Sequence, residues 1–114
     1  MAITANVIDC LHGRPAAGLA VHLKRRGDNG WDNCASGSTG HDGAVAGWSP
    51  SPPARTDRGL YRLVFDSGSY YAVLGVESFH SRVTIEFIVA DPDADFHVPL
   101  LLGPYAYTTF RSDQ

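Results

Sequence analysis

The stretch that decides the fold is the C-terminal one, which reads Phe96-His-Val-Pro-Leu-Leu-Leu-Gly-Pro-Tyr-Ala-Tyr-Thr-Thr-Phe-Arg-Ser-Asp-Gln114. An apolar run and an alternating run lie on either side of a Gly-Pro turn signal at 103–104. Short runs bounded by such residues are typical of β-strands. The stretch therefore predicts two strands, residues 96–102 and 106–112, with His97 and Arg111 set among apolar side chains.

The remaining sequence repeats this pattern of short runs separated by turn residues. The 114 residues include 12 glycines and 7 prolines, which favours many turns and many short strands. We expect further strands at residues 3–9, 19–25, 31–38, 60–66 and 82–89, and at most a short edge strand at 44–48. Eight short strands in a single domain, residues 1–114, predict an all-β sandwich of two sheets with Greek-key connections.

One segment departs from the strand pattern. Residues 67–74 form the only expected helix, with Ser67 as its N-cap and Gly75 as the residue that ends it. The longest expected loop is the proline-rich segment 49–59, which follows the edge segment.

The composition excludes several classes of protein. A formal charge of −3 and a pI near 5.9 give no basic surface for nucleic acid. No apolar run is long enough to span a bilayer, and the N-terminal residues lack the features of a signal peptide. With only Cys10 and Cys34, we expect no disulfide framework and a cytoplasmic location.

Neither a metal site nor a cofactor is predicted. His12, His22, His41 and His80 lack the spacing of metal ligands. The acidic turn at 91–95 is similar to the opening of a calcium loop, but it lacks the loop's glycine and its distal glutamate.

Four further motifs precede the C-terminal stretch: Asn6-Val-Ile-Asp-Cys-Leu-His-Gly-Arg-Pro-Ala-Ala-Gly18, Asp28-Asn-Gly-Trp31, Gly59-Leu-Tyr-Arg62 and Glu77-Ser-Phe79. Together the five resemble the transthyretin-like 5-hydroxyisourate hydrolase family over nearly the whole chain. The resemblance implies a transthyretin-like two-sheet β-sandwich with one short helix. It also implies hydrolysis of an amide bond in the ring of 5-hydroxyisourate, in urate degradation. The expected assembly is a homotetramer, a dimer of dimers, with the sites in the channel between the dimers.

The resemblance further implies a catalytic set, of which this chain keeps only part. The family's first-strand histidine is Asn6 here, and the arginine after its Asp-Gly turn is Ala44. His97 is retained. The family's Tyr-Arg-Gly-Ser tail becomes Phe110-Arg111-Ser112-Asp113, with Gln114 after it. Asparagine cannot accept a proton at neutral pH, and alanine has neither a charge nor a donor. We therefore expect inefficient hydrolysis of 5-hydroxyisourate.

Strand alternation predicts which side chains share the site, because every second residue of a strand faces the same way. We assign His97 as the catalytic base, with Arg111 as the second catalytic residue. The residues expected to contact the substrate are Asn6, Ile8, Ala44, Pro99, Leu101, Thr108, Phe110, Ser112 and Asp113. Such a site is more apolar and less charged than the family's usual one. In a weaker hypothesis, Asp113 orients His97, and Arg55 or Arg58 replaces the missing guanidinium.

Each key residue also has a structural interpretation. A lone histidine on a strand is more often structural than catalytic, and Arg111 could be a solvated or inter-subunit charge. Asn6 is either a replaced catalytic residue or an ordinary polar channel residue.

Three functions remain in competition. The favoured one is an enzyme that opens, or otherwise acts on, a small cyclic metabolite of the lactam or imide type. The second is a small-ligand binding protein, as transthyretin is, and the third is a genuine hydroxyisourate hydrolase. A purely structural tetramer is a weaker alternative.

Overall fold

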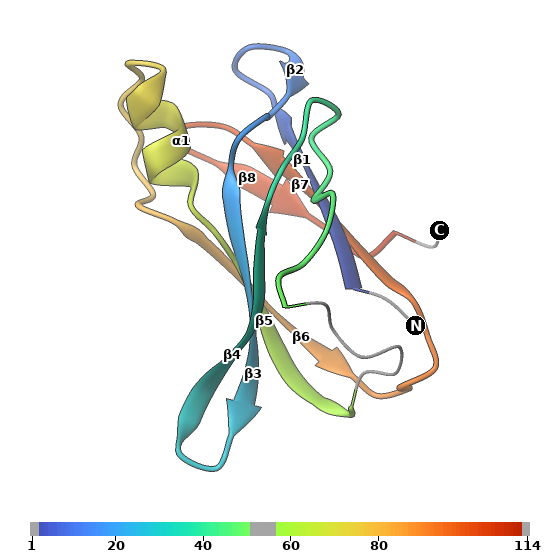
Figure 1. Cartoon of the computed structure of the whole chain (residues 1–114). Coiled ribbons are helices and arrows are strands. Elements are labelled where there is room, and N and C mark those ends of the chain that lie inside the picture. Colours follow the sequence, from blue (N-terminus) through green and yellow to red (C-terminus); the bar gives the residue numbers. More distant parts are fainter. Residues whose placement is uncertain (1–2, 51–56, 113–114) are drawn as a thin grey trace.

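The structure is a computed structural model, and it describes residues 3–50 and 57–112. Two β-sheets pack face to face, and a short helix lies at one end of the sandwich (Figure 1). The described elements, in chain order, are β1 (Ile3–Asp9), β2 (Arg14–Pro15), β3 (Ala20–Gly27), β4 (Gly30–Ser38), β5 (Gly59–Phe65), α1 (Ser67–Val73), β6 (Val83–Val89), β7 (Phe96–Leu102) and β8 (Tyr107–Thr109).

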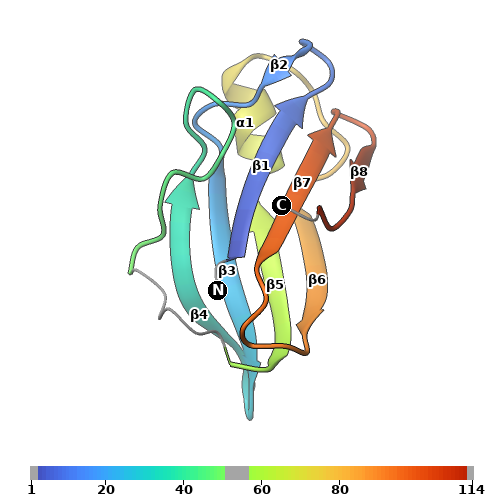
Figure 2. The ribbon, with the colours of Figure 1, turned by 90° about the vertical axis from the view of Figure 1, so that its right-hand side faces the viewer.

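The two sheets have the strand orders β2-β1-β7-β8 and β4-β3-β5-β6. In the first sheet β1 and β7 pair in parallel, from Ile3 opposite Phe96 to Asp9 opposite Leu102. The other pairs of named strands are antiparallel. Figure 2 looks onto the first sheet and shows β1 and β7 side by side, pointing the same way, with β8 at the edge. The predicted two-sheet β-sandwich is confirmed.

The core between the sheets is built from alternate residues of the strands. The odd-numbered residues of β1 are buried, whereas Thr4 is exposed and Asn6 and Ile8 are half-buried. Burying a valine or leucine side chain contributes roughly 1.5–3 kcal/mol, so this alternation fixes which face of β1 points inward. The largest apolar side chains that are almost wholly buried are Val7, Leu19, Val21, Leu63, Phe65, Tyr71, Val83, Val89, Leu100 and Leu102.

No regular strand forms at 44–48, where at most a short edge strand is expected. Ala44 and Val45 make only single bridges, to Asn6 and Thr39 respectively. Glycines at both ends and in the middle of the segment 40–47 favour turns over a continuous strand.

Two other strand boundaries differ from the sequence expectation. The turn expected at 12–15 contains β2, whose two residues pair with the end of β1. The last strand is shorter than the predicted 106–112, because regular pairing stops at Thr109 and resumes only as a bridge between Ser112 and His97.

The helix begins at Ser67 as expected, but Asp66 rather than Ser67 is at the N-cap. Ser67 is only 2% exposed because its side chain turns inward, and its hydroxyl oxygen has no hydrogen-bond partner. The expected stop at Gly75 is confirmed. Gly75 has φ +72° and donates its N–H to Ala72, while the N–H of Val76 reaches back to Tyr71. These two bonds form a Schellman motif.

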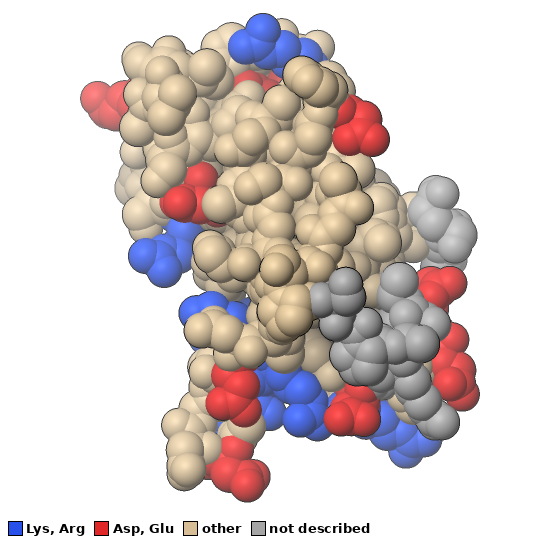
Figure 3. Space-filling view, in the orientation of Figure 1, with Lys and Arg blue, Asp and Glu red and all other residues tan. Residues whose placement is uncertain are grey.

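Charged side chains of both signs are scattered over the face seen in Figure 3, without a single-sign patch. This distribution agrees with the small net charge of the sequence. Among the described residues there is no helix with the length and apolar character of a membrane span.

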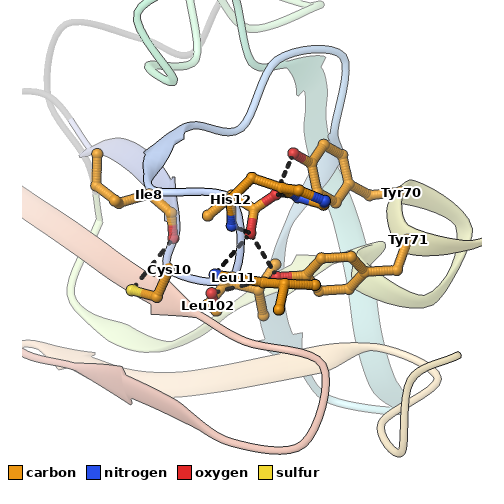
Figure 4. A network of polar contacts seen from close by, with 8 residues as sticks. Ile8, Cys10, Leu11, His12, Tyr70, Tyr71 and Leu102 are labelled. Atoms are coloured by element: carbon orange, nitrogen blue, oxygen red, sulfur yellow. Dashed lines mark hydrogen bonds and ion pairs between the residues drawn. The ribbon is translucent and has the colours of Figure 1, made fainter. Parts of the chain in front are cut away.

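A buried carboxylate ties the end of β1 to the helix. Asp9 is fully buried and accepts hydrogen bonds from the hydroxyls of Tyr70 at 2.7 Å and Tyr71 at 3.0 Å. The backbone N–H groups of Leu11 and His12 donate to it, and Nδ1 of His12 lies 2.6 Å from its Oδ2 (Figure 4). Burial raises the pKa of Asp9, but the hydrogen bonds from His12, Tyr70 and Tyr71 outweigh it and bring the pKa to about 2.

This tie predicts acid-sensitive stability. A carboxyl group whose pKa falls from 3.8 to about 2 on folding contributes about 2 kcal/mol. The contribution is present above pH 3.8 and is lost as the pH falls through about 2. We expect Asp9→Asn to lower the free energy of unfolding in urea by about 2 kcal/mol at neutral pH, and by progressively less in acid.

Asp28→Asn is the matched control, because Asp28 is exposed in the turn between β3 and β4. We expect it to change the stability little at any pH. An equal loss in the two variants, or a loss from Asp9→Asn that stays constant down to pH 2, contradicts the assignment.

Candidate active site

Several of the candidate site residues lie in rows across the outer surface of the β2-β1-β7-β8 sheet. Opposed residues of paired strands point to the same side of a sheet. Thr4 opposes His97 across β1 and β7, and Ser112 opposes His97 from the other side. In a second row Asn6 lies between Ala44 and Pro99, and in a third row Leu101 lies between Ile8 and Thr108. We call the following residues the outer face: Thr4, Asn6, Ile8, Ala44, His97, Pro99, Leu101, Thr108, Phe110 and Ser112.

Of the sequence-predicted site residues in the described part of the chain, all but Arg111 lie on the outer face. Asn6 opposes Pro99, and Ile8 opposes Leu101. Phe110 lies at the border, since its ring also lines a hollow at the open edge between β6 and β8.

The imidazole ring of His97 is held in place by a contact with Thr4. The hydroxyl oxygen of Thr4 lies 2.6 Å from Nδ1 of His97 and 3.4 Å from the carbonyl oxygen of Phe96. The backbone carbonyl of His97 accepts a 2.9 Å hydrogen bond from Ser112. Thr4 was not among the predicted site residues. Alternation along β1 places it on the same face as Asn6, but only the pairing of β1 with β7 reveals its contact with His97.

The turn at 40–45 delivers Ala44 to the side of Asn6. Gly43 has φ +80° and its carbonyl accepts a 2.8 Å hydrogen bond from Val7, while Val45 donates to the carbonyl of Ala5 at 3.0 Å. The position next to Asn6 is therefore well fixed, and in this chain it holds a methyl group. Neither Asn6 nor Ala44 brings a charge to the outer face.

Arg111 is not brought to His97. Its guanidinium lies over the ring of Phe96, 4.6 Å from the ring centre, and donates to the carbonyl of Asp95 at 3.3 Å. Phe96 is a buried core residue. Since Ser112 shares the face of His97, the residue before it points to the opposite side of the sheet. Arg111 lines the hollow of about 220 Å³ between β6 and β8.

Among the other guanidinium and carboxylate candidates only Arg58 is described, and it does not add to the outer face. Asp113 and Arg55 lie outside the described residues. Arg58 precedes β5 in the opposite sheet, where its carbonyl accepts a 2.9 Å hydrogen bond from Arg25. In the described part of the chain no cluster of histidine, cysteine or carboxylate side chains could hold a metal ion.

The outer face thus combines one imidazole, one carboxamide and several hydroxyl groups with apolar side chains. An imidazole can move a proton near neutral pH, and a carboxamide or hydroxyl can donate a hydrogen bond to developing negative charge. The arrangement is suited to hydrolysis or to binding of a small polar ring.

Comparison with known proteins shows the family to which the chain belongs. The model of the family described as HIUase/Transthyretin matches residues 3–112. The chain belongs to the HIUase/Transthyretin family. The 5-hydroxyisourate hydrolase 2 of Rhizobium meliloti is 38% identical, over 96% of this chain and 93% of its own length. The 5-hydroxyisourate hydrolase of Pseudomonas aeruginosa is 36% identical, over 96% and 89%.

A solved structure of a family member has the same fold. The Klebsiella pneumoniae 5-hydroxyisourate hydrolase superposes with a TM-score of 0.82 at 31% identity, covering 97% of this chain and 98% of its own. The family's sandwich is therefore preserved in this chain.

The placement of Ala44 predicts an unusual sensitivity at Gly43. A Cβ at this residue would collide with the carbonyl oxygen of Val7 in addition to adopting a left-handed backbone. Gly13 has φ +69° with open space around it, so Gly13→Ala measures the backbone penalty alone, about 1 kcal/mol. We expect Gly43→Ala to cost at least about 2 kcal/mol in urea unfolding. Equal costs in the two variants would show that the turn relaxes away from β1.

Proposed function

We propose that this chain is a hydrolase that opens a small cyclic amide, with His97 as the general base. One observation carries the proposal. Among the described residues of the outer face His97 has the only ionisable side chain, and its Nδ1 is already engaged by Thr4. The second ring nitrogen, Nε2, is then the atom that meets a water molecule. A neutral imidazole accepts a proton from water near physiological pH.

The reaction follows from these groups. Nε2 of His97 takes a proton from water while the water oxygen attacks the carbonyl carbon of the ring, and the carbonyl electrons move to oxygen. As the oxyanion re-forms the carbonyl, the ring C–N bond breaks and its electron pair goes to nitrogen. That nitrogen takes the proton from His97. One water is consumed, the product carries a carboxylic acid and an N–H group, and His97 is regenerated.

Asn6 is the proposed partner of the oxyanion. It opposes Pro99 on β1, two residues along the strand from the row that holds His97. Its carboxamide N–H can donate to the negative oxygen, and donors of this kind typically contribute about 10²–10³-fold to the rate. Asn6 cannot serve as a second base.

The proposed substrate is a lactam-like or imide-like ring with little negative charge. Ala44 supplies no cation beside Asn6, and Ile8, Pro99 and Leu101 make the rest of the face apolar. The relatives are named as 5-hydroxyisourate hydrolases, so 5-hydroxyisourate is the first ring to test. We expect slower turnover than a site with a histidine at position 6 and an arginine at position 44.

The second candidate is a non-catalytic ligand-binding protein. It is favoured by the apolar members of the outer face, of which Leu101 is 37% exposed and Phe110 52% exposed. Such a protein binds a flat ring without converting it.

We also propose a homotetramer in the reducing cytoplasm, with small molecules as its other partners. The open edges at β6 and β8 carry Ile88, which is 69% exposed, and Phe110, and both line the hollow of about 220 Å³. A second copy that pairs along these edges would cover them and remove two free strand edges. Cys10 and Cys34 are free thiols, which suits a reducing compartment.

Turnover of freshly generated 5-hydroxyisourate, followed by absorbance, tests the activity. We expect His97→Ala to abolish the acceleration over the spontaneous background, because it removes the base. His22→Ala is the matched control, since His22 is exposed on the opposite sheet. The double variant Asn6→His/Ala44→Arg should turn over the same substrate at least about tenfold faster.

Two outcomes contradict the proposal. Loss of turnover in His22→Ala as large as in His97→Ala would remove the specific role of His97. If neither 5-hydroxyisourate nor a panel of neutral lactams and imides is converted, while calorimetry detects their binding, the chain is a carrier.

Sedimentation velocity tests the assembly. We expect Ile88→Lys to shift the protein from a tetramer to smaller species, because it places a charge in the apolar hollow that the second copy would cover. Thr84→Lys is the control, since Thr84 is an exposed residue of the same strand that does not line the hollow. A monomeric wild-type protein at micromolar concentration would contradict the assembly.

A further inference from the structure

We propose that Thr4 is a positioning residue that fixes the tautomer of His97 and so makes Nε2 its basic atom. The kinetic part of this proposal rests on the proposed function, whereas the tautomer can be measured without any substrate. Thr4 and His97 are 93 residues apart in sequence and oppose each other across the parallel β1–β7 pair.

The two contacts of the Thr4 hydroxyl set the direction of the hydrogen bonds. Its oxygen lies 2.6 Å from Nδ1 of His97 and 3.4 Å from the carbonyl oxygen of Phe96. A carbonyl only accepts, and a hydroxyl has a single proton to donate. Both contacts are satisfied when Thr4 donates to the carbonyl and Nδ1–H of His97 donates to Thr4.

This direction decides which nitrogen can act. A neutral imidazole has one N–H, so a proton on Nδ1 leaves a lone pair on Nε2. If the hydroxyl instead donated to Nδ1, the proton would sit on Nε2, and His97 would be a donor rather than a base. An unconstrained neutral histidine favours the Nε2–H tautomer, so the structure selects the less common form.

Thr4 orients the ring without adding charge. In many catalytic pairs a carboxylate performs this task and also stabilises the imidazolium that forms. A hydroxyl fixes the ring and the tautomer but offers less stabilisation of the positive ring. The arrangement is consistent with an outer face on which no other described residue has an ionisable side chain.

The tautomer of His97 can be read by two-dimensional ¹H–¹⁵N NMR of the ¹⁵N-labelled protein, at a pH where the ring is neutral. We expect Nδ1–H in the wild type, Nδ1–H in Thr4→Ser, and mainly Nε2–H in Thr4→Val. Valine has nearly the same shape and suits a strand, so the variant should fold. Thr84→Val, on an exposed residue of β6, should leave the His97 signals unchanged.

Kinetics provide the second readout. We expect Thr4→Val to lower turnover of a convertible ring by about tenfold and Thr4→Ser to recover most of it. A wild-type His97 in the Nε2–H form, or a tautomer that stays the same in Thr4→Val, overturns the proposal. A protein with the expected tautomers but no turnover leaves the role of Thr4 in place and removes only the proposed hydrolase function.

Discussion

The parallel pairing of β1 with β7 is the constraint on which the rest of the structure depends. Parallel neighbours cannot be joined by a hairpin, so strands β2 to β6 and the helix all lie between them in the sequence. This pairing brings Thr4 to His97 and Asn6 to Pro99. With one residue of slippage the even-numbered residues of β1 would enter the core, and the buried aliphatic side chains would face water.

Contacts at both ends and along one side hold β1 in place, and few of them involve residues of the outer face. At its end, Asp9 accepts the hydroxyls of Tyr70 and Tyr71 from the helix. At its start, the indole N–H of Trp48 donates to the carbonyl of Ile3 at 2.8 Å. On the side of β1 away from β7, the N–H of Val7 donates to the carbonyl of Gly43. Side chains on such a strand are held in fixed positions, which is what a functional site requires of its scaffold.

The sequence alone was sufficient to predict the elements whose boundaries are set by local signals. β1 and β7 begin and end where alternation and turn residues place them, and the positive φ of Gly75 ends the helix as expected. Ser67 was misassigned as the cap because sequence cannot show that its side chain turns into the protein. The expected strand at 44–48 failed because tertiary bridges to β1 replaced regular pairing.

The part of the candidate site that follows from strand alternation could be predicted from the sequence. Asn6, Pro99 and Leu101 follow from the period of two, and they share a face. Thr4 required the register between two distant strands, which no local pattern contains. Arg111 was assigned to the site by resemblance, but it packs on Phe96 because the residue after it, Ser112, takes the face of His97. The same long-range pairing governs biosynthesis: until β7 has emerged from the ribosome, the apolar flank of β1 has no permanent neighbour. The outer face therefore cannot be assembled until the last part of the chain has been synthesised, and long-range pairing of this kind leaves an early strand unpaired for longer.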